Sequence, residues 1–477
     1  MTHSTAGASR APEHTHPAPH PRRWAALALV CTAQFMLILD VTVVNVALPD
    51  MAADLALGRT ALTWVVTSYT LCFGGLMLLG GRLADALGAR RALLAGLALF
   101  TAASLVTGLA GNAPVLLGGR IAQGVGAALL SPSALSLVTT TFHGGERTKA
   151  LGVWAAIGGS GAAAGVLLGG ALTDGPGWQW VFYVNVPVGL AVLAAIPAFV
   201  AARAPRPARL DVPGALLVTA GTGALIYGLV KAGDTGWADP ATLLPLAGAA
   251  VAYALFAVVE RTGRAPLMDL RMFTRRPVLA GAFLMLTATA LLIAYFFLGS
   301  VYLQHVRGFG PLKTGLVFLP VAVATGLGAH LGSRLVGVIG SRTAAVAGMV
   351  VAAAGTVPLT RLSDTASVYG SLLPGFVIAS LGIGAVFVTA TTTALAMVEH
   401  REAGLASGVV NTFHEVGGSI GVAVVSTVAA SGIERGTVGG FTDAFTICAV
   451  AAAVGAVVAL ALVPRGKPRM TGGPHVH

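Results

Sequence analysis

Three ionisable side chains stand alone within long apolar stretches of this sequence, namely Asp40, Arg120 and Glu415. A charge in the middle of a bilayer costs at least about 2.5 to 3.5 kcal/mol, so it normally faces a partner or a wet cavity. A carboxylate balanced between burial, which favours its protonated form, and a nearby cation, which favours its ionised form, can exchange a proton. An arginine stays charged, but it responds to whether such a carboxylate is ionised. These residues therefore point to proton coupling, and a static buried salt bridge between Asp40 and Arg120 is the alternative.

Uncharged polar residues accompany the charges at helical spacing. Gln123 follows Arg120 by three residues, so the two lie near one helix face at about 100° per residue. Gln34 and Asn45 are nearly eclipsed on their helix, whereas Asp40 lies about 140° away from Asn45. We expect Gln34, Asn45 and Gln123 to contact a ligand, and Asp40 to act in coupling near the edge of its helix.

A second polar face contains Asn411, His414 and Glu415. Asn411 and His414 are candidate ligand contacts, and Glu415 is a candidate for attracting a cationic substrate or carrying a second proton. A purely structural partnership around His414 is an equal alternative for Glu415. The His-Glu pair is no zinc protease motif, because Gly418 occupies the position of the second histidine.

The composition indicates the kind of element that must position these side chains. The chain has 477 residues, of which 56% are apolar and only 10% charged, whereas soluble domains carry about 25% charged residues. The net charge of +11 does not indicate nucleic acid, because the cations are scattered between apolar runs instead of clustered on one face. The composition predicts an all-α protein embedded in the lipid bilayer.

Apolar runs of about 20 residues, the length that spans a bilayer, predict fourteen spans. Most of the 29 Lys and Arg residues fall in alternate loops, which places both termini in the cytoplasm. The predicted spans are 24–47, 61–80, 92–111, 114–140, 149–172, 179–201, 212–231, 240–259, 277–303, 313–333, 343–360, 368–395, 404–430 and 443–463. The predicted organisation is a disordered tail at 1–23, a six-helix bundle at 24–202, two extra spans with linkers at 203–276, a second six-helix bundle at 277–464, and a tail at 465–477.

An internal repeat supports two bundles. The stretch GGRLADALGARRALLAG at 80–96 matches GSRLVGVIGSRTAAVAG at 332–348 without gaps, and the matches include two arginine pairs. The first copy joins the second and third predicted spans, and the second copy joins the tenth and eleventh. Parallel repeats with a substrate site at their interface are typical of major facilitator transporters.

Several motifs resemble the fourteen-span drug:proton antiporters of the major facilitator superfamily. LDVTVVNVALP at 39–49 resembles the signature of that branch, and WQWVFYVNVP at 178–187 resembles its entry into span 6. Arg120 with Gln123 resembles the span 4 motif, and 406–422 resembles the small-residue stripe of span 13. The span 5 motif lacks its usual proline, since Val166 follows Gly165, and His414-Glu415 stands where an Arg-Gln-like pair is expected.

The resemblance implies a major facilitator fold and proton-coupled export of amphipathic drugs or antibiotics by alternating access, with the proton gradient as energy source and no cofactor. It further implies a monomeric transporter and no enzyme activity. A dedicated exporter of one metabolite or self-made antibiotic is an alternative, as is a channel or sensor, although the repeat favours a carrier. The loop motif suggests a cytoplasmic gate, or merely positive-inside anchoring, at Gly81, Asp85, Gly88, Arg90 and Arg91. Close helix packing and bundle sliding are expected at Gly161, Gly165, Gly169 and Gly170.

Overall fold

A computed structural model of the chain describes residues 22–142, 144–200, 211–263, 266, 271, 274–363, 367–395, 403–430, 435 and 437–465. The two predicted tails lie almost wholly outside these residues. Within them every regular element is a helix and no strand occurs. Twelve of the helices are long and apolar enough to cross a membrane. The bounds are α1 Arg23–Asp54, α2 Arg59–Leu87, α3 Ala89–Gly108, α4 Ala113–Thr141, α5 Gly144–Asp174, α6 Trp180–Tyr183, α7 Asn185–Phe199, α8 Val212–Thr235, α9 Pro240–Thr262, α10 Arg276–Val301, η2 Tyr302–Val306, α11 Pro311–Ile339, α12 Ser341–Thr356, η3 Val357–Arg361, η4 Val368–Leu372, α13 Leu373–Leu395, α14 Ala403–Val428 and α16 Val438–Leu462.

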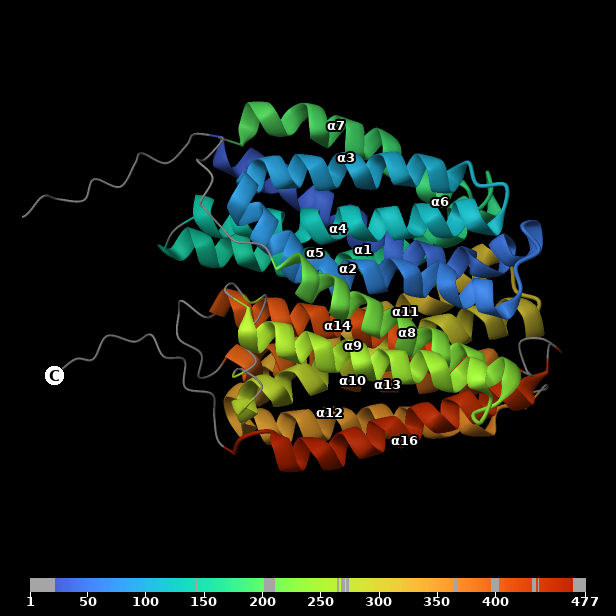
Figure 1. The fold of residues 1–477 in the computed structure, drawn as a ribbon. Coiled ribbons are helices and arrows are strands. Elements are labelled where there is room, and N and C mark those ends of the chain that lie inside the picture. Colours follow the sequence, from blue (N-terminus) through green and yellow to red (C-terminus); the bar gives the residue numbers. More distant parts are fainter. Residues whose placement is uncertain are drawn as a thin grey trace, which may run out of the picture.

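The helices form two stacked bundles, with α1 to α7 in one and α10 to α16 in the other (Figure 1). α1 begins and α16 ends at the same end of the molecule. α8 and α9 pack on each other, and α8 contacts both α2 and α14. The inserted pair therefore flanks the seam where the two bundles meet.

Capping residues, and not the charges that flank the apolar runs, mark some of the helix boundaries. The side chain of Asn112 accepts a hydrogen bond from the backbone N–H of Val115 at 3.0 Å, and Pro114 lies in the first turn of α4. The end of an apolar run does not mark the end of a helix. α1 continues to Asp54, past its predicted end at 47, and α2 continues to Leu87, past its predicted end at 80. The predicted single span 179–201 is divided at Val184 into α6 and α7.

The sequence repeat corresponds to a repeated structure. Gly88 between α2 and α3 has φ 89°, and its counterpart Gly340 between α11 and α12 has φ 81°. Both lie in the left-handed region that glycine adopts without a steric penalty. The helices joined by the first turn pack on α4, and those joined by the second pack on α13. The two turns are therefore equivalent parts of two related bundles.

The most extensive contacts between the two bundles are those of α5 with α11 and of α2 with α14. A Cβ added to Gly170 of α5 would lie 2.8 Å from the Cα of Leu312, and one added to Gly315 of α11 would meet the backbone oxygen of Val166. Because α5 ends and α11 begins there, the bundles are closed against each other at the end opposite the start of α1 and the end of α16. Gln304 reinforces this closure by donating a hydrogen bond to the carbonyl of Val46 at 2.7 Å.

The glycines of α5 serve two different contacts. A Cβ added to Gly161 would meet Ile38, one added to Gly165 would meet Thr42, and one added to Gly169 would lie 3.0 Å from the Cα of Val43. These three glycines let α5 approach α1 closely. Gly170, about 100° further round the helix, faces α11 of the other bundle instead.

The outer surface of the helices is apolar. Leu109, Leu244 and Val338 are each at least two-thirds exposed, at 67%, 71% and 69%. Large apolar side chains exposed in this way suit a hydrocarbon environment. With the twelve candidate spans, this surface identifies a multi-pass membrane protein.

Candidate functional site: a buried ion pair and a polar cluster at the seam

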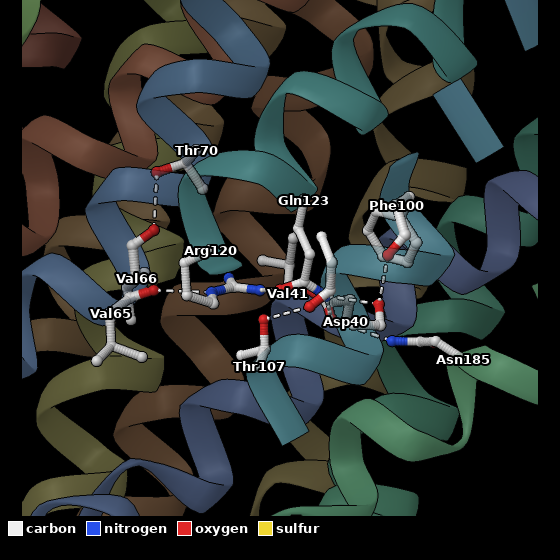
Figure 2. Close-up of polar contacts among 12 residues, drawn as sticks. Asp40, Val41, Val65, Val66, Thr70, Phe100, Thr107, Arg120, Gln123 and Asn185 are labelled. Atoms are coloured by element: carbon white, nitrogen blue, oxygen red, sulfur yellow. Dashed lines mark hydrogen bonds and ion pairs between the residues drawn. The ribbon is translucent and has the colours of Figure 1, made fainter. Parts of the chain in front are cut away.

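The Asp40 carboxylate is the centre of a buried network inside the first bundle (Figure 2). Its Oδ2 accepts a hydrogen bond from Nη1 of Arg120 at 2.5 Å. Its Oδ1 accepts from the side-chain amides of Gln123 at 3.1 Å and Asn185 at 3.3 Å. Asp40 is 0% exposed and Arg120 1%. The ion pair is therefore enclosed by protein, as a charged pair in a membrane bundle must be.

The Arg120 guanidinium is fixed by further contacts. Its Nε donates to the backbone carbonyl of Val65 at 2.9 Å, and its Nη1 also donates to Oε1 of Gln123 at 2.9 Å. Its central carbon lies 4.3 Å from the centre of the Tyr69 ring, within cation–π range. The network therefore ties α1, α2, α4 and α7 together around one carboxylate.

Sequence reasoning missed several members of this network. Asn185 lies in the WQWVFYVNVP motif, yet nothing in that motif shows that its amide reaches Asp40. Ser104 of α3 accepts a hydrogen bond from Gln123 at 2.8 Å, and no sequence signal pointed to it. Tyr69 is fully buried beneath Arg120. Each of these partners is brought in by tertiary packing from another helix.

Gln123 differs from its predicted position. The sequence predicts that it contacts a ligand, but it is 0% exposed, and all of its described contacts are to Asp40, Arg120 and Ser104. In this conformation it belongs to the ion-pair network and is sealed from solvent. Asp40 is likewise in the interior of the first bundle and not at the edge of its helix.

A second polar cluster lies where α14 faces α10, α13 and α2. Nδ1 of His414 is 2.9 Å from Oγ1 of Thr289, and its ring centre is 5.5 Å from that of Phe387. Nε2 of His414 is 4.0 Å from Oε1 of Glu415. Their side chains are 40% and 13% exposed, respectively. This cluster thus combines a carboxylate, an imidazole and an aromatic ring with partial access, unlike the sealed ion pair.

The cluster lies directly at the seam between the bundles. A Cβ added to Gly74 of α2 would lie 2.5 Å from the Cβ of Glu415. One helical turn away, the hydroxyls of Thr70 and Ser419 are 2.5 Å apart. The absence of a side chain at Gly74 therefore makes room for Glu415 between the bundles.

The other predicted ligand contacts are dispersed. Asn411 is exposed on α14, and Gln34 is half-buried on α1. Asn45 is buried and donates to the carbonyl of Val41 of its own helix at 2.7 Å. The buried side-chain oxygens of Gln34 and Asn45 have no hydrogen-bond partner among the described residues. Both therefore keep an unused acceptor.

The part of the chain that the structure describes shows no closed charge network at the predicted cytoplasmic gate. Within the described residues, Asp85, Arg90 and Arg91 form no ion pair, and Asp85 and Arg91 are exposed. Arg82, from the same turn, donates to the carbonyl of Pro266 at 3.1 Å. The turn that holds Gly81 and Gly88 is thus linked through Arg82 to the segment after α9.

The fold and the two repeated bundles are those of a membrane transporter. The sequence model of the Major Facilitator Superfamily matches residues 30–422, and the chain belongs to that superfamily. It is a transporter and not an enzyme.

Relatives of the chain have names that refer to antibiotics. It is 41% identical over 461 residues to the puromycin resistance protein of Streptomyces alboniger, covering 93% of this chain and 91% of that one. It is 39% identical to the cephamycin export protein CmcT of Amycolatopsis lactamdurans, with 85% of each chain covered. It is 36% identical to the lincomycin resistance protein of Streptomyces lincolnensis over 93% of this chain and 92% of that one.

Solved structures share the fold. A peptide transporter POT in complex with alafosfalin matches with a TM-score of 0.66, covering 94% of this chain and 96% of that one at 16% identity. A bacterial homologue of the human lysosomal transporter Spinster, in an inward-facing and unoccupied conformation, matches with a TM-score of 0.63 over 93% and 97%. At 16% identity these likenesses concern the fold alone.

Proposed function

We propose that the chain exports amphipathic drugs or antibiotics across the cytoplasmic membrane in exchange for protons, by rocking its two bundles around a site at their seam. The observation that carries this proposal is the sealed ion pair between Asp40 and Arg120. The antibiotic resistance and export proteins among its relatives support the substrate class. The proton gradient supplies the energy, and no cofactor takes part.

Protonation of Asp40 is the coupling event in this proposal. When ionised, the carboxylate holds Arg120 and Gln123 of α4 and Asn185 of α7. Protonation removes the charge that binds the guanidinium, so α4 and α7 are released from the carboxylate of α1. Because proton and substrate must affect each other's binding for one gradient to drive the other, this rearrangement has to reach the seam.

The substrate site in this proposal lies at the His414 and Glu415 cluster. A partly exposed carboxylate beside the ring of Phe387 suits a molecule with a cationic group and an aromatic body. Glu415 attracts that cation or carries a second proton, and His414 and Asn411 contact the ligand. The unused acceptor oxygens of Gln34 and Asn45 on α1, and Gln123 once it is released from the ion-pair network, complete the set.

The proposed topology has fourteen spans. α5 and α14 are 31 and 26 residues long and pack against the membrane-spanning helices α1 and α10, so we count them with the twelve candidates. The boundaries proposed are bundles at 24–202 and 277–464, with the inserted spans and linkers at 203–276 and tails at 1–23 and 465–477. Both termini are cytoplasmic in this scheme, so the closed contact between α5 and α11 faces outward. A monomer suffices, because one chain supplies both bundles.

In the same scheme, the turn between α2 and α3 lies at the cytoplasmic mouth. Asp85, Arg90 and Arg91 are exposed or half-buried there and form no ion pair among the described residues. We propose that these charges pair when the cytoplasmic side closes, with Gly81 and Gly88 allowing the close approach. The smooth faces of α5, formed by its glycines, then allow the bundles to slide.

A narrower substrate range is the second candidate. The cephamycin export protein and the puromycin resistance protein are each named for one antibiotic, which favours a dedicated exporter of one metabolite or self-made antibiotic. Susceptibility to a panel of unrelated compounds distinguishes the two candidates. Protection against a single chemical class supports the dedicated exporter, and protection against several supports the multidrug exporter.

The decisive experiment is efflux of puromycin and ethidium from a pump-deficient host, with and without a proton uncoupler. The variants are Asp40→Asn and Arg120→Ala, and the matched control is Asp54→Asn. Asp54 is on the same helix but accepts its hydrogen bonds from Trp178 at 2.8 Å and Gln179 at 3.4 Å, outside the network. We expect uncoupler-sensitive efflux in wild type and control and its loss in both variants at equal expression. Wild-type efflux in Asp40→Asn would rule out Asp40 as the coupling residue.

A further inference from the structure

The hydroxyl of Tyr69 is the most unusual polar group near the ion pair. The side chain is 0% exposed, and its oxygen has no hydrogen-bond partner among the described residues. Leaving a buried hydroxyl unpaired is unfavourable, because the group has lost its water without gaining a partner. The contacts of the Tyr69 hydroxyl in this conformation do not explain why a buried tyrosine occupies this position.

The position of Tyr69 suggests that explanation. Its ring lies beneath the Arg120 guanidinium, 4.3 Å from ring centre to guanidinium carbon. Its hydroxyl interacts electrostatically with Asp40, Arg120 and Glu415 together. Tyr69 is therefore the residue of α2 that senses both the sealed ion pair in the first bundle and the carboxylate at the seam.

α2 is also the helix of the first bundle that contacts α14 of the second bundle. Thr70, next in the chain, is hydrogen-bonded to Ser419 of α14 at 2.5 Å. Gly74, one turn further, is the residue against which Glu415 packs. A change at Tyr69 is thus within about one and a half helical turns of the contacts that must part when the bundles rock.

We propose that Tyr69 is the positioning residue that links the two ionisable sites, by donating its hydroxyl hydrogen to the Glu415 carboxylate in the state of the transport cycle in which that carboxylate is ionised. This inference rests on the proposed function and names the route by which its two sites communicate. A phenol that donates to a carboxylate becomes more electron-rich, so its ring attracts the guanidinium above it more strongly. A change in the charge of Glu415 thereby changes the electrostatic environment of Arg120 and Asp40, and no proton moves from Glu415 to Asp40.

The groups that bear on Tyr69 come from three helices packed around α2. They are Asp40 from α1, Arg120 from α4, and Glu415 with its neighbour His414 from α14. On α2 itself the nearest titratable group is Cys72, which is half-buried. Asp40 is held at 2.5 Å by the Arg120 guanidinium, whereas Glu415 has the His414 imidazole at 4.0 Å as its basic neighbour, so Glu415 is the acceptor available to the hydroxyl.

The test is Tyr69→Phe, with Tyr295→Phe as the matched control. Tyr295 is also fully buried, but its hydroxyl lies 2.5 Å from that of Thr356 in the second bundle. Thermal unfolding of the purified proteins and the pH profile of ethidium and puromycin efflux are measured for both. A stabilising role would lower the melting temperature, whereas a linking role changes the pH profile.

We expect opposite results for the two variants. Tyr69→Phe should leave the melting temperature unchanged or raised, because its hydroxyl has no hydrogen-bond partner within the described part of the chain. It should move the pH of half-maximal efflux upward by about one unit, since a hydrogen bond to the ionised carboxylate is lost. Tyr295→Phe should lower the melting temperature and leave the profile in place. In a Glu415→Gln background, Tyr69→Phe should have no further effect on the profile.

Superimposed profiles for wild type and Tyr69→Phe would overturn the inference and leave the proposed export function intact. So would a profile shift of the same size in the Glu415→Gln background. Absence of any pH-dependent efflux in wild type would overturn the proposed function and this inference together.

Discussion

Replacing Asp40 by asparagine tests the ion pair most sharply, because the two side chains have the same shape. The carboxylate offers two acceptor oxygens and uses both, one for Arg120 and one for Gln123 and Asn185. Asparagine has one acceptor oxygen and one amino group. Whichever way it points, its amino group faces a donor from Arg120 or the donors of the two amides.

Rotation of the Gln123 amide does not rescue the variant. In the native network, the Gln123 oxygen accepts from Arg120 at 2.9 Å while its nitrogen donates to Asp40 and Ser104. Turning the amide round would satisfy the new asparagine but would place an N–H against the guanidinium. Arg120 therefore loses either its charge partner or a hydrogen bond in every arrangement.

We expect Asp40→Asn to destabilise the protein by about 3 to 5 kcal/mol, the cost of leaving one member of a buried ion pair alone. The double variant Asp40→Asn with Arg120→Met should recover much of this stability, since replacing both charges is often neutral. It should not recover proton-coupled efflux. Thermal unfolding in detergent and efflux at matched expression are the measurements.

A wild-type melting temperature for Asp40→Asn would refute the reasoning, because it would mean that the carboxylate is not ionised against Arg120. Uncoupler-sensitive efflux in the stable double variant would equally refute the coupling role of the pair. Asp54→Asn, in the same helix, serves as the control for both measurements.

Three further predictions concern the seam, the topology and the substrate site. Gly315→Val should abolish export, because the new side chain is forced into the backbone of α5. Gly326→Val on the same helix, where an added Cβ meets nothing within 4 Å, should remain active. Equal efflux from both variants would contradict closure at α5 and α11. A membrane-impermeant maleimide should label Gly111→Cys but not Arg465→Cys in intact cells, and the reverse pattern would place the termini outside. Glu415→Gln should reduce ethidium efflux more than efflux of an uncharged substrate, and an equal reduction of both would remove Glu415 from cation recognition.

The sequence predicted the helical class, the repeat and the importance of the Asp40 and Arg120 charges, because charge is so scarce in this chain that each exception is conspicuous. The periodic placement of glycine also predicted close packing of α5. The matched turns at Gly88 and Gly340 could be found because both turns need the same left-handed backbone.

The partners of those charges could not be predicted in the same way. Asn185, Ser104 and Tyr69 reach the ion pair from α7, α3 and α2, and which residue of a helix faces inward depends on how the helices are rotated in the bundle. The same limit applies to Gly170, which faces the other bundle although its neighbour Gly169 packs on α1. Gln123, predicted to contact a ligand, is instead enclosed within the ion-pair network, because the rotation of α4 in the bundle turns its side chain toward Asp40.

The central claim, exchange of substrate for protons, is tested most directly in proteoliposomes that contain a pH-sensitive dye. Puromycin or ethidium added to one side, with no pH gradient present, should drive protons the opposite way in liposomes with wild-type protein, and should leave the internal pH unchanged with Asp40→Asn. Substrate movement across liposomes with wild-type protein without any change of internal pH would contradict the claim.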